Sequence, residues 1–336
     1  MKKNKNTVDE INNAIGKDIA FYGADIKEKQ IQALPTGILP LDWAIGIGGF
    51  PKGRIIEIHG KESSGKSSLC LAIIAQYQKM GLKCCYVDAE YTFSFELAEK
   101  FGVNTDDLLI IKSDYGEEAF DAMEKLVRSG TIDFIVIDSI SALVPKAVLE
   151  ADTEKTHIGP HAKMVTKGVS RLVGALEKNA CTIVFINQLR MNIMGGQYDQ
   201  WIVTGGQALK HYSSLMLEVH KDRAIMLGEK LIGYGMRIRV KKNKVGIPGE
   251  ECLVKLLFNK GFSAESDILA YGQKAGIILK EGNTYSYKGE KMGIGENKAR
   301  LWLETNQTLA EEILSQLQQQ QSPESETPQQ ETPHSQ

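Results

Sequence analysis

The sequence carries little net charge, which limits what overall electrostatics can indicate. Its 336 residues include 40 Lys and Arg against 42 Asp and Glu, so the formal net charge is −2. Domains that bind nucleic acid through their overall field are usually strongly basic. Any nucleic-acid surface on this chain must therefore come from local clusters of Lys and Arg.

Long apolar runs and paired-cysteine patterns are also missing. No stretch approaches the roughly 20 apolar residues of a membrane-spanning helix, so we expect no membrane contact. The basic residues 1–6 lack the apolar stretch that would make them a secretory signal. The cysteines form no C-x-x-C pattern and lie in apolar runs, which argues against a disulfide framework or zinc site and favours reduced core thiols in a cytoplasmic protein. They are Cys70, Cys84, Cys85, Cys181 and Cys252.

Short apolar runs alternate with helical patterns over much of the chain. The runs cover residues 54–59, 84–88, 108–112, 134–138 and 181–187. Buried strands that alternate with helices indicate a mostly parallel sheet with helices on both faces. After residue 210, three strand-like runs follow with no long helix between them, and we expect them to extend the sheet as antiparallel strands.

The composition divides the chain into four parts. Residues 1–33 hold a short amphipathic helix, opened by a capping box at Thr7, whose apolar face needs the main domain or a neighbouring subunit for burial. Residues 34–262 form the α/β core, and residues 263–317 have the pattern of a small α+β domain. Residues 318–336 are rich in Gln, Pro, Ser and Glu, which predicts a disordered tail.

The strongest motif is a phosphate-binding loop of the form G-x-x-x-x-G-K-[ST]. It lies between a predicted strand and a predicted helix, where backbone N–H groups and the helix start can hold phosphate oxygens. Lys66 should reach the β- and γ-phosphates, and the Ser67 hydroxyl should ligate Mg²⁺. The alternative is a chance turn rich in Gly and Ser. The expected residues for ATP with Mg²⁺ are Gly60, Lys61, Glu62, Ser63, Ser64, Gly65, Lys66, Ser67 and Ser68.

Two carboxylates follow predicted strands. Asp138 ends the run at 134–138 and could hold Mg²⁺ directly or through a water, although an Asp at a strand end is often a turn former. Glu90 follows the run at 84–88. At the carboxyl edge of a parallel sheet it could orient or deprotonate an attacking water. The alternative for Glu90 is a solvated position in a loop.

A long polar segment suggests a binding loop. Residues 189–203 are rich in Gly, Gln and Asn, and loops of this length are usually functional or disordered. Arg190 could contact phosphate, while Met191 and Ile193 could contact bases. That combination suits single-stranded DNA without sequence preference. Alternatively, Ile193 and Trp201 pack against their own domain.

The order of these motifs resembles that of the bacterial RecA recombinases. The likeness extends over residues 34–317 and is carried by residues 60–67, 88–90, 137–139, 185–190, 204–206, 242–244 and 285–291. It implies a P-loop NTPase core of the RecA type. It also implies an ATP-dependent recombinase that forms a filament of its own subunits on single-stranded DNA and pairs that strand with homologous duplex. Co-protease activity toward an SOS repressor is a further expectation from the family.

The resemblance also implies individual roles. Glu90 matches the glutamate that activates water, and Gln188 matches the glutamine that senses the γ-phosphate. Lys242 and Lys244 match lysines that reach the ATP of a neighbouring subunit; the alternative is a solvated basic edge that discourages sheet aggregation. The DNA contacts implied in the same way are Ile158, Lys163, Arg190, Met191, Ile193, Gly205 and Gly206.

Two other functions remain open at this point. A hexameric helicase could be built on the same core, and an ATP-gated filament could serve mainly as a regulatory scaffold. The sequence also departs from the family pattern at residues 91–95, which run Tyr-Thr-Phe-Ser-Phe in a segment that partly contacts adenine in the family.

Overall fold

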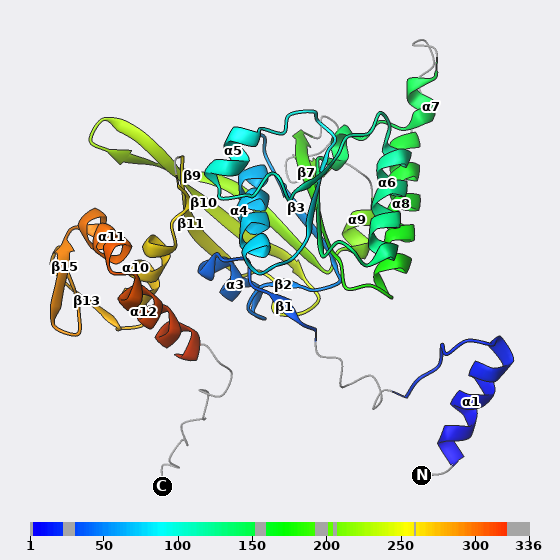
Figure 1. Cartoon of the computed structure of the whole chain (residues 1–336), viewed down its shortest axis with the longest axis horizontal. Helices are drawn as coiled ribbons and strands as arrows, with labels where there is room; N and C mark the ends of the chain where they lie inside the picture. Colours follow the sequence, from blue (N-terminus) through cyan, green and yellow to red (C-terminus); the bar gives the residue numbers. More distant parts are fainter. Residues whose placement is uncertain are drawn as a thin grey trace, which may run out of the picture.

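A large twisted sheet forms the centre of the molecule (Figure 1). The structure is a computed structural model that describes residues 3–22, 31–151, 159–191, 201–203, 207–258 and 260–320. Six neighbouring strands of the sheet run parallel, in the order β9-β3-β7-β6-β4-β5. Their bounds are β3 (Ile55–Gly60), β4 (Cys84–Asp88), β5 (Leu109–Ile111), β6 (Phe134–Asp138), β7 (Thr182–Met191) and β9 (Leu215–Leu227).

Antiparallel strands extend one side of this sheet. They follow β9 in the order β10 (Lys230–Asn243), β11 (Glu251–Leu257) and β12 (Gly261–Phe262). The predicted parallel core with an antiparallel extension is confirmed. The first of the three late strands, β9, is nevertheless parallel to β3, so the change of direction begins only at β10.

Helices cover both faces of the sheet and bury two apolar layers. One layer lies under α3 (Leu39–Ile45), α4 (Lys66–Lys79) and α5 (Phe95–Lys100). The other lies under α6 (Gly116–Ser129), α8 (Pro160–Leu176) and α9 (Gln207–Tyr212). The apolar runs of the central strands are buried on both sides, as parallel strands between helices require. All five cysteines lie in buried positions.

Smaller elements connect the layers. The pair β1 (Ala33–Leu34) and β2 (Phe50–Pro51) is antiparallel, and η1 (Ile140–Ala142) and α7 (Lys146–Leu149) follow β6. No helix within the described ranges combines the length and apolar character needed to cross a membrane.

The C-terminal part folds around its own apolar cluster. The antiparallel strands β13 (Ile278–Glu281), β14 (Thr284–Tyr287) and β15 (Glu290–Ile294) pack with α10 (Ala264–Lys274), α11 (Glu296–Thr305) and α12 (Gln307–Gln320). Trp43 of α3 meets Tyr271 of α10 edge to face, with ring centroids 4.7 Å apart. This contact joins the small cluster to the main sheet.

Three predicted element boundaries were wrong. The first helix, α1 (Lys3–Ile15), begins before Thr7, so the predicted cap lies inside the helix. The last helix continues through Gln320 and passes the predicted start of the tail at residue 318. Residues 189–191 extend β7 and pair with β8 (Trp201–Val203), so the predicted loop begins as an antiparallel hairpin. Backbone pairing overrides the loop-like composition there.

Candidate nucleotide site

The phosphate loop joins β3 to α4. Gly60 ends the strand, and a Cβ atom at this position would collide with the carbonyl oxygen of Val219 on the adjacent strand. Gly65 precedes the helix with a φ of 93°, in the left-handed region that favours glycine. Ser64 is buried, and its hydroxyl oxygen has no hydrogen-bond partner among the described residues. A buried polar atom in a tight glycine-bounded loop at a helix start fits an anionic ligand.

Lys66 opens α4 with its side chain folded back over the loop. Its ammonium group donates to the carbonyl oxygens of Gly60 (3.1 Å) and Lys61 (2.8 Å). Burial lowers the pKa of Lys66, and the charges of Asp138 and Glu90 oppose that shift. The exposed fraction of Lys66 is 7%, so its positive charge would act on a phosphate with little screening by water.

The next helix residue meets the carboxylate that ends β6. The Ser67 hydroxyl donates to Oδ2 of Asp138 over 2.5 Å, and the Tyr86 hydroxyl of β4 donates to the same oxygen over 2.6 Å. Burial raises the pKa of Asp138, while the two hydroxyl donors lower it. A hydroxyl and a carboxylate beside the phosphate loop are the oxygen ligands that Mg²⁺ prefers, so these residues fit the metal. Tyr86 was not predicted, because it is separated from Asp138 by 52 positions in sequence.

Glu90 lies next to this cluster at the carboxyl edge of the sheet. Its Oε1 accepts hydrogen bonds from the Ser139 hydroxyl (2.6 Å) and from Nε2 of Gln188 (3.0 Å). Ser139 also bonds the Ser141 hydroxyl at 2.7 Å. Glu90 after β4, Ser139 after β6 and Gln188 within β7 thereby form one hydrogen-bonded group. A carboxylate oriented in this way could direct an attacking water.

A cavity of about 540 Å³ opens from the loop toward the antiparallel strands. Beyond the loop its lining is largely apolar. The ammonium nitrogen of Lys221 lies over the ring of Tyr234, 3.2 Å from the ring centroid. The lining includes Leu97, Phe101, Tyr234, Leu256, Leu257 and Phe258. Such walls could hold the flat faces of a nucleobase. No local motif marked these residues, because they come from separate parts of the chain.

Two of the predicted catalytic residues, Lys242 and Lys244, lie at the other edge of the sheet. Lys242 pairs with Met216, and the N–H of Lys244 donates to the carbonyl of Ser214 over 2.8 Å. These positions are near the start of β3, whereas the phosphate loop follows its end. The Lys242 ammonium donates to the carbonyl oxygens of Lys210 (2.5 Å) and His211 (3.3 Å), and that of Lys244 also donates to His211 (3.1 Å).

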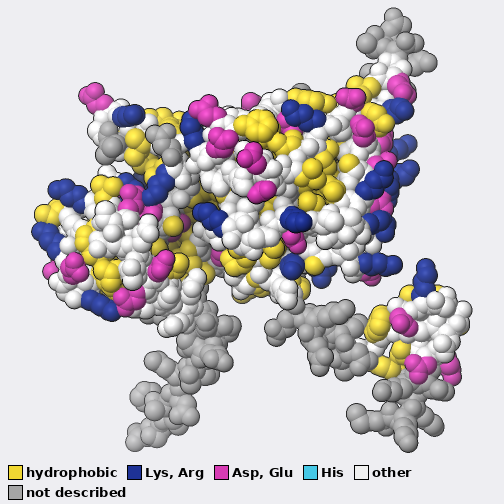
Figure 2. Space-filling model, viewed as in Figure 1, with side chains coloured by type: hydrophobic (Ala, Val, Ile, Leu, Met, Phe, Trp, Pro, Cys, Tyr) yellow, Lys and Arg dark blue, Asp and Glu magenta, His cyan; other side chains and the backbone are white. Residues whose placement is uncertain are grey.

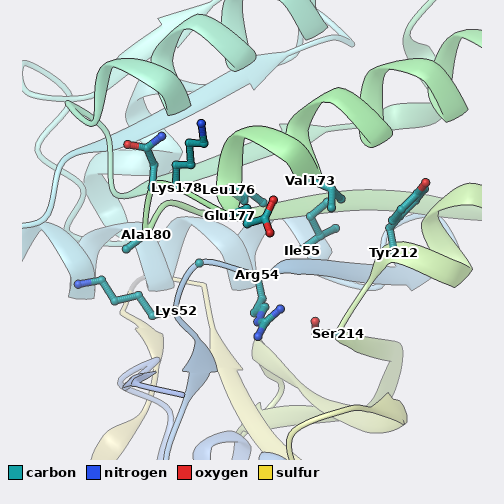
Figure 3. Close-up of a pocket in the computed structure, with 12 residues that line it drawn as sticks. Lys52, Arg54, Ile55, Val173, Leu176, Glu177, Lys178, Ala180, Tyr212 and Ser214 are labelled. Carbon is teal, nitrogen blue, oxygen red and sulfur yellow. The ribbon is translucent and has the colours of Figure 1, made fainter. Parts of the chain in front are cut away.

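This amino edge of the sheet is also hollowed. A cavity of about 650 Å³ lies here, lined by Arg54 just before β3, by Tyr212 at the end of α9 and by Ser214 just after it (Figure 3). Lys52 and Lys178 add positive charge to its rim. The amino edge is therefore a separate basic surface, distinct from the phosphate loop.

Four of the predicted DNA contacts, Ile158, Ile193, Gly205 and Gly206, lie outside the described residues. Arg190 and Met191 belong to β7, but their side chains are not among those described. Lys163 lies exposed in the first turns of α8. On the face in Figure 2, Lys and Arg side chains gather along the edge formed by α6 and α8, mixed with Asp and Glu.

The parallel sheet, the loop between β3 and α4, and the carboxylate at the end of β6 define a P-loop NTPase. A family model described as RecA N-terminal domain matches residues 2–263, and one described as RecA C-terminal domain matches residues 266–321. The chain is 41% identical to Protein RecA of Campylobacter lari over 92% of this chain and 90% of that protein. It is 43% identical to Protein RecA of Geobacter sulfurreducens over 88% of this chain and 87% of that protein. The chain belongs to the RecA family.

This membership confirms the resemblance seen in the motifs. The protein is a DNA-dependent ATPase that acts in DNA recombination and repair. ATP is its nucleotide, and the cluster around Lys66, Asp138 and Glu90 is the candidate site of hydrolysis.

Proposed function

We propose that the chain polymerises on single-stranded DNA with ATP and Mg²⁺ and pairs that strand with homologous duplex. Ser67 and Asp138 would hold Mg²⁺, which supplies positive charge beside the transferred phosphate. Lys66 would bind the β- and γ-phosphates, and Glu90, held by Gln188, would orient the attacking water. Gly205 and Gly206 would bind DNA phosphates directly before α9.

One observation carries the proposal for a filament. Lys242 and Lys244 lie at the amino edge of the sheet, and the phosphate loop lies beyond the carboxyl edge. A lysine at the far end of β10 cannot serve the nucleotide of its own chain. A head-to-tail contact between subunits would bring the amino edge of one against the loop of the next and would not close. The lysines would then stabilise the γ-phosphate in trans, as an arginine finger does.

The flanking parts of the chain complete this arrangement. We assign residues 1–33 to subunit contact, residues 34–262 to the ATPase core and the residues from 263 through the end of α12 at Gln320 to a C-terminal domain, followed by a tail. Ile11 and Ile15 of α1 are exposed, which leaves an apolar helix face for a neighbouring subunit. We place the filament in the cytoplasm, with an SOS repressor as a further partner, on the basis of family membership.

A mixing experiment tests the shared site. Lys242→Ala protein should bind ATP normally but show little DNA-stimulated hydrolysis, because its neighbour's nucleotide lacks a cation. Glu90→Gln protein should be inactive for lack of the water-orienting carboxylate. Mixed filaments should exceed the sum of the two separate activities, because some interfaces join intact lysines to an intact Glu90. Mixtures that co-assemble without any gain at any ratio would refute the shared site.

A further inference from the structure

A carboxylate is buried in the middle of the central sheet, where the hydrolysis reaction does not need it. Glu57 lies in β3 with 1% of its surface exposed, and its Oε1 accepts a hydrogen bond from Nδ2 of Asn187 in β7 over 3.0 Å. A buried carboxylate is costly unless it is hydrogen-bonded or paired with a cation. An apolar residue at this position would avoid that cost.

On one side, the pair reaches the nucleotide site of its own subunit. Asn187 precedes Gln188, and Oδ1 of Asn187 accepts from the N–H of Gln188 over 2.9 Å. The Gln188 side chain in turn donates to Glu90 over 3.0 Å. Three hydrogen bonds therefore connect Glu57 to the carboxylate that orients water.

On the other side, the same carboxylate faces the amino edge. Glu57 pairs with Met216 of β9, which pairs with Lys242 of β10, so Glu57 and Lys242 lie in one row across three strands. Burial raises the pKa of Glu57 to about 7, and the hydrogen bond from Asn187 and the charge of Lys242 oppose that shift. Lys242 therefore lies two strands from Glu57 in the same row, while its ammonium group donates to the carbonyl oxygens of Lys210 and His211 in α9.

We propose that Glu57 is a positioning residue that couples the two halves of the shared ATP site within one subunit. It holds Asn187, and through it Gln188, toward the subunit's own nucleotide, and it holds Lys242 in the position offered to the neighbour's nucleotide. The inference rests on the proposed function, because it requires that Lys242 act in trans. A change at Gln188 would alter the hold of Asn187 on Glu57 and hence the electrostatic attraction between Glu57 and Lys242, since the carboxylate itself is shielded from water.

Two substitutions separate the two sides of this coupling. Glu57→Gln keeps an amide oxygen that can accept from Asn187 but removes the charge that faces Lys242. Glu57→Leu removes both interactions. Asp42→Asn is the matched control, because Asp42 is also a buried carboxylate whose pKa is raised to about 7 by burial, but it lies in α3 and accepts a hydrogen bond from Thr36. Melting temperature and ATP affinity are measured for each variant to exclude misfolding.

The experiment uses two mixed filaments, and the kcat of DNA-stimulated hydrolysis is measured in both. In the first, a minority of the test variant is mixed with excess Glu90→Gln protein, so hydrolysis reports the variant's own pocket. In the second, a wild-type minority is mixed with excess Glu90→Gln protein that also carries the test substitution. Only the wild-type pockets can hydrolyse ATP there, so the rate reports how well the lysines of the substituted neighbours serve those pockets. Lys242→Ala is the reference substitution in the second filament.

The coupling predicts a pattern that a merely structural role would not give. Glu57→Leu should lower kcat about tenfold in both filaments. In the first it removes the charge-assisted hydrogen bond with Asn187, and in the second it removes the charge that acts on Lys242. Glu57→Gln should lower kcat to this extent in the second filament alone and remain within about twofold of wild type in the first, while Asp42→Asn remains within about twofold in both. If Lys242→Ala suppresses the second filament and Glu57→Gln does not, the coupling is wrong. If Lys242→Ala itself has no effect in the second filament, the shared site is wrong, and the coupling, which depends on it, is wrong as well.

Discussion

The two edges of the central sheet are built in different ways. At the carboxyl edge, Ser67, Asp138, Glu90 and Gln188 are hydrogen-bonded to other side chains of the same chain. At the amino edge, the ammonium groups of Lys242 and Lys244 bond backbone carbonyl oxygens of α9. The first edge is a preorganised site within one subunit. The second presents charge that a carbonyl holds only weakly and that a phosphate would attract more strongly.

This difference teaches how hydrolysis can depend on assembly. A site completed within one chain would hydrolyse ATP in the free subunit. A site that receives its last cations from another subunit, as we propose for this protein, would become active only once a filament has formed on DNA. The two edges should therefore respond differently to substitution, and the largest difference is expected at the phosphate loop.

Loss of the loop lysine should have the largest effect on turnover. Lys66→Ala should lower kcat at least about a hundredfold, because the phosphates lose a buried cation in a poorly solvated site. It should do so whether or not intact subunits surround the variant, since no neighbour can replace a carboxyl-edge group. ATPase assays of the variant alone and in mixed filaments measure this. Lys79→Ala, at the exposed end of the same helix, is the control. Turnover of Lys66→Ala near the wild-type rate would show that Lys66 does not act in ATP hydrolysis.

A smaller effect is expected at Tyr86, which supports Asp138 from behind. Tyr86→Phe removes the hydroxyl that donates to Asp138 over 2.6 Å. The Mg²⁺ concentration for half-maximal hydrolysis should rise about tenfold, as is typical when a residue that orients a metal ligand is removed.

Tyr77→Phe is the control, because Tyr77 is also buried and its hydroxyl donates to the carbonyl of Leu34, away from Asp138. Titrations with Mg²⁺ at saturating ATP compare the two variants. Equal Mg²⁺ requirements in Tyr86→Phe and wild type would show that Asp138 does not depend on this hydroxyl.

The sequence was most informative where a function is local in the chain. The phosphate loop and Glu90 each follow a buried strand and Asp138 ends one, and the strand order then places them at one edge. Tyr86, Ser139 and the pair of Glu57 with Asn187 were missed as site residues. Their partners lie on neighbouring strands, and which residues meet depends on the register of β3, β4, β6 and β7. Spacing along the chain does not reveal that register.

The antiparallel strands β8 and β10 show the same limit of prediction from sequence. Composition alone predicted a continuous loop over residues 189–203, but backbone hydrogen bonds between β7 and β8 shorten it. Lys242 and Lys244 were predicted two apart on a strand, whereas β10 ends at Asn243 and Lys244 lies just beyond it. The contacts of the two lysine side chains with α9 depend on the tertiary fold.

The smallest effect on turnover is expected for a buried carboxylate that belongs to neither edge. Asp42 accepts from the N–H and hydroxyl of Thr36, and burial raises its pKa from 3.8 to about 7. The folded protein therefore keeps a proton on Asp42 that the unfolded chain releases as the pH rises above 3.8. The stability that this proton confers is complete below pH 3.8 and is lost as the pH rises through about 7.

Asp42→Asn replaces the carboxyl group with an amide that does not ionise. The stability of the variant relative to wild type should therefore increase with pH, while its ATP turnover stays unchanged. Between about pH 5 and about pH 8, the difference in unfolding free energy should shift in favour of the variant by on the order of 2 kcal/mol. Urea unfolding at both pH values measures the shift, and any constant packing difference cancels. Asp106→Asn, at an exposed position, should show no such trend. Parallel pH curves for Asp42→Asn and wild type would mean that Asp42 stays charged when buried, held by the two hydrogen bonds from Thr36.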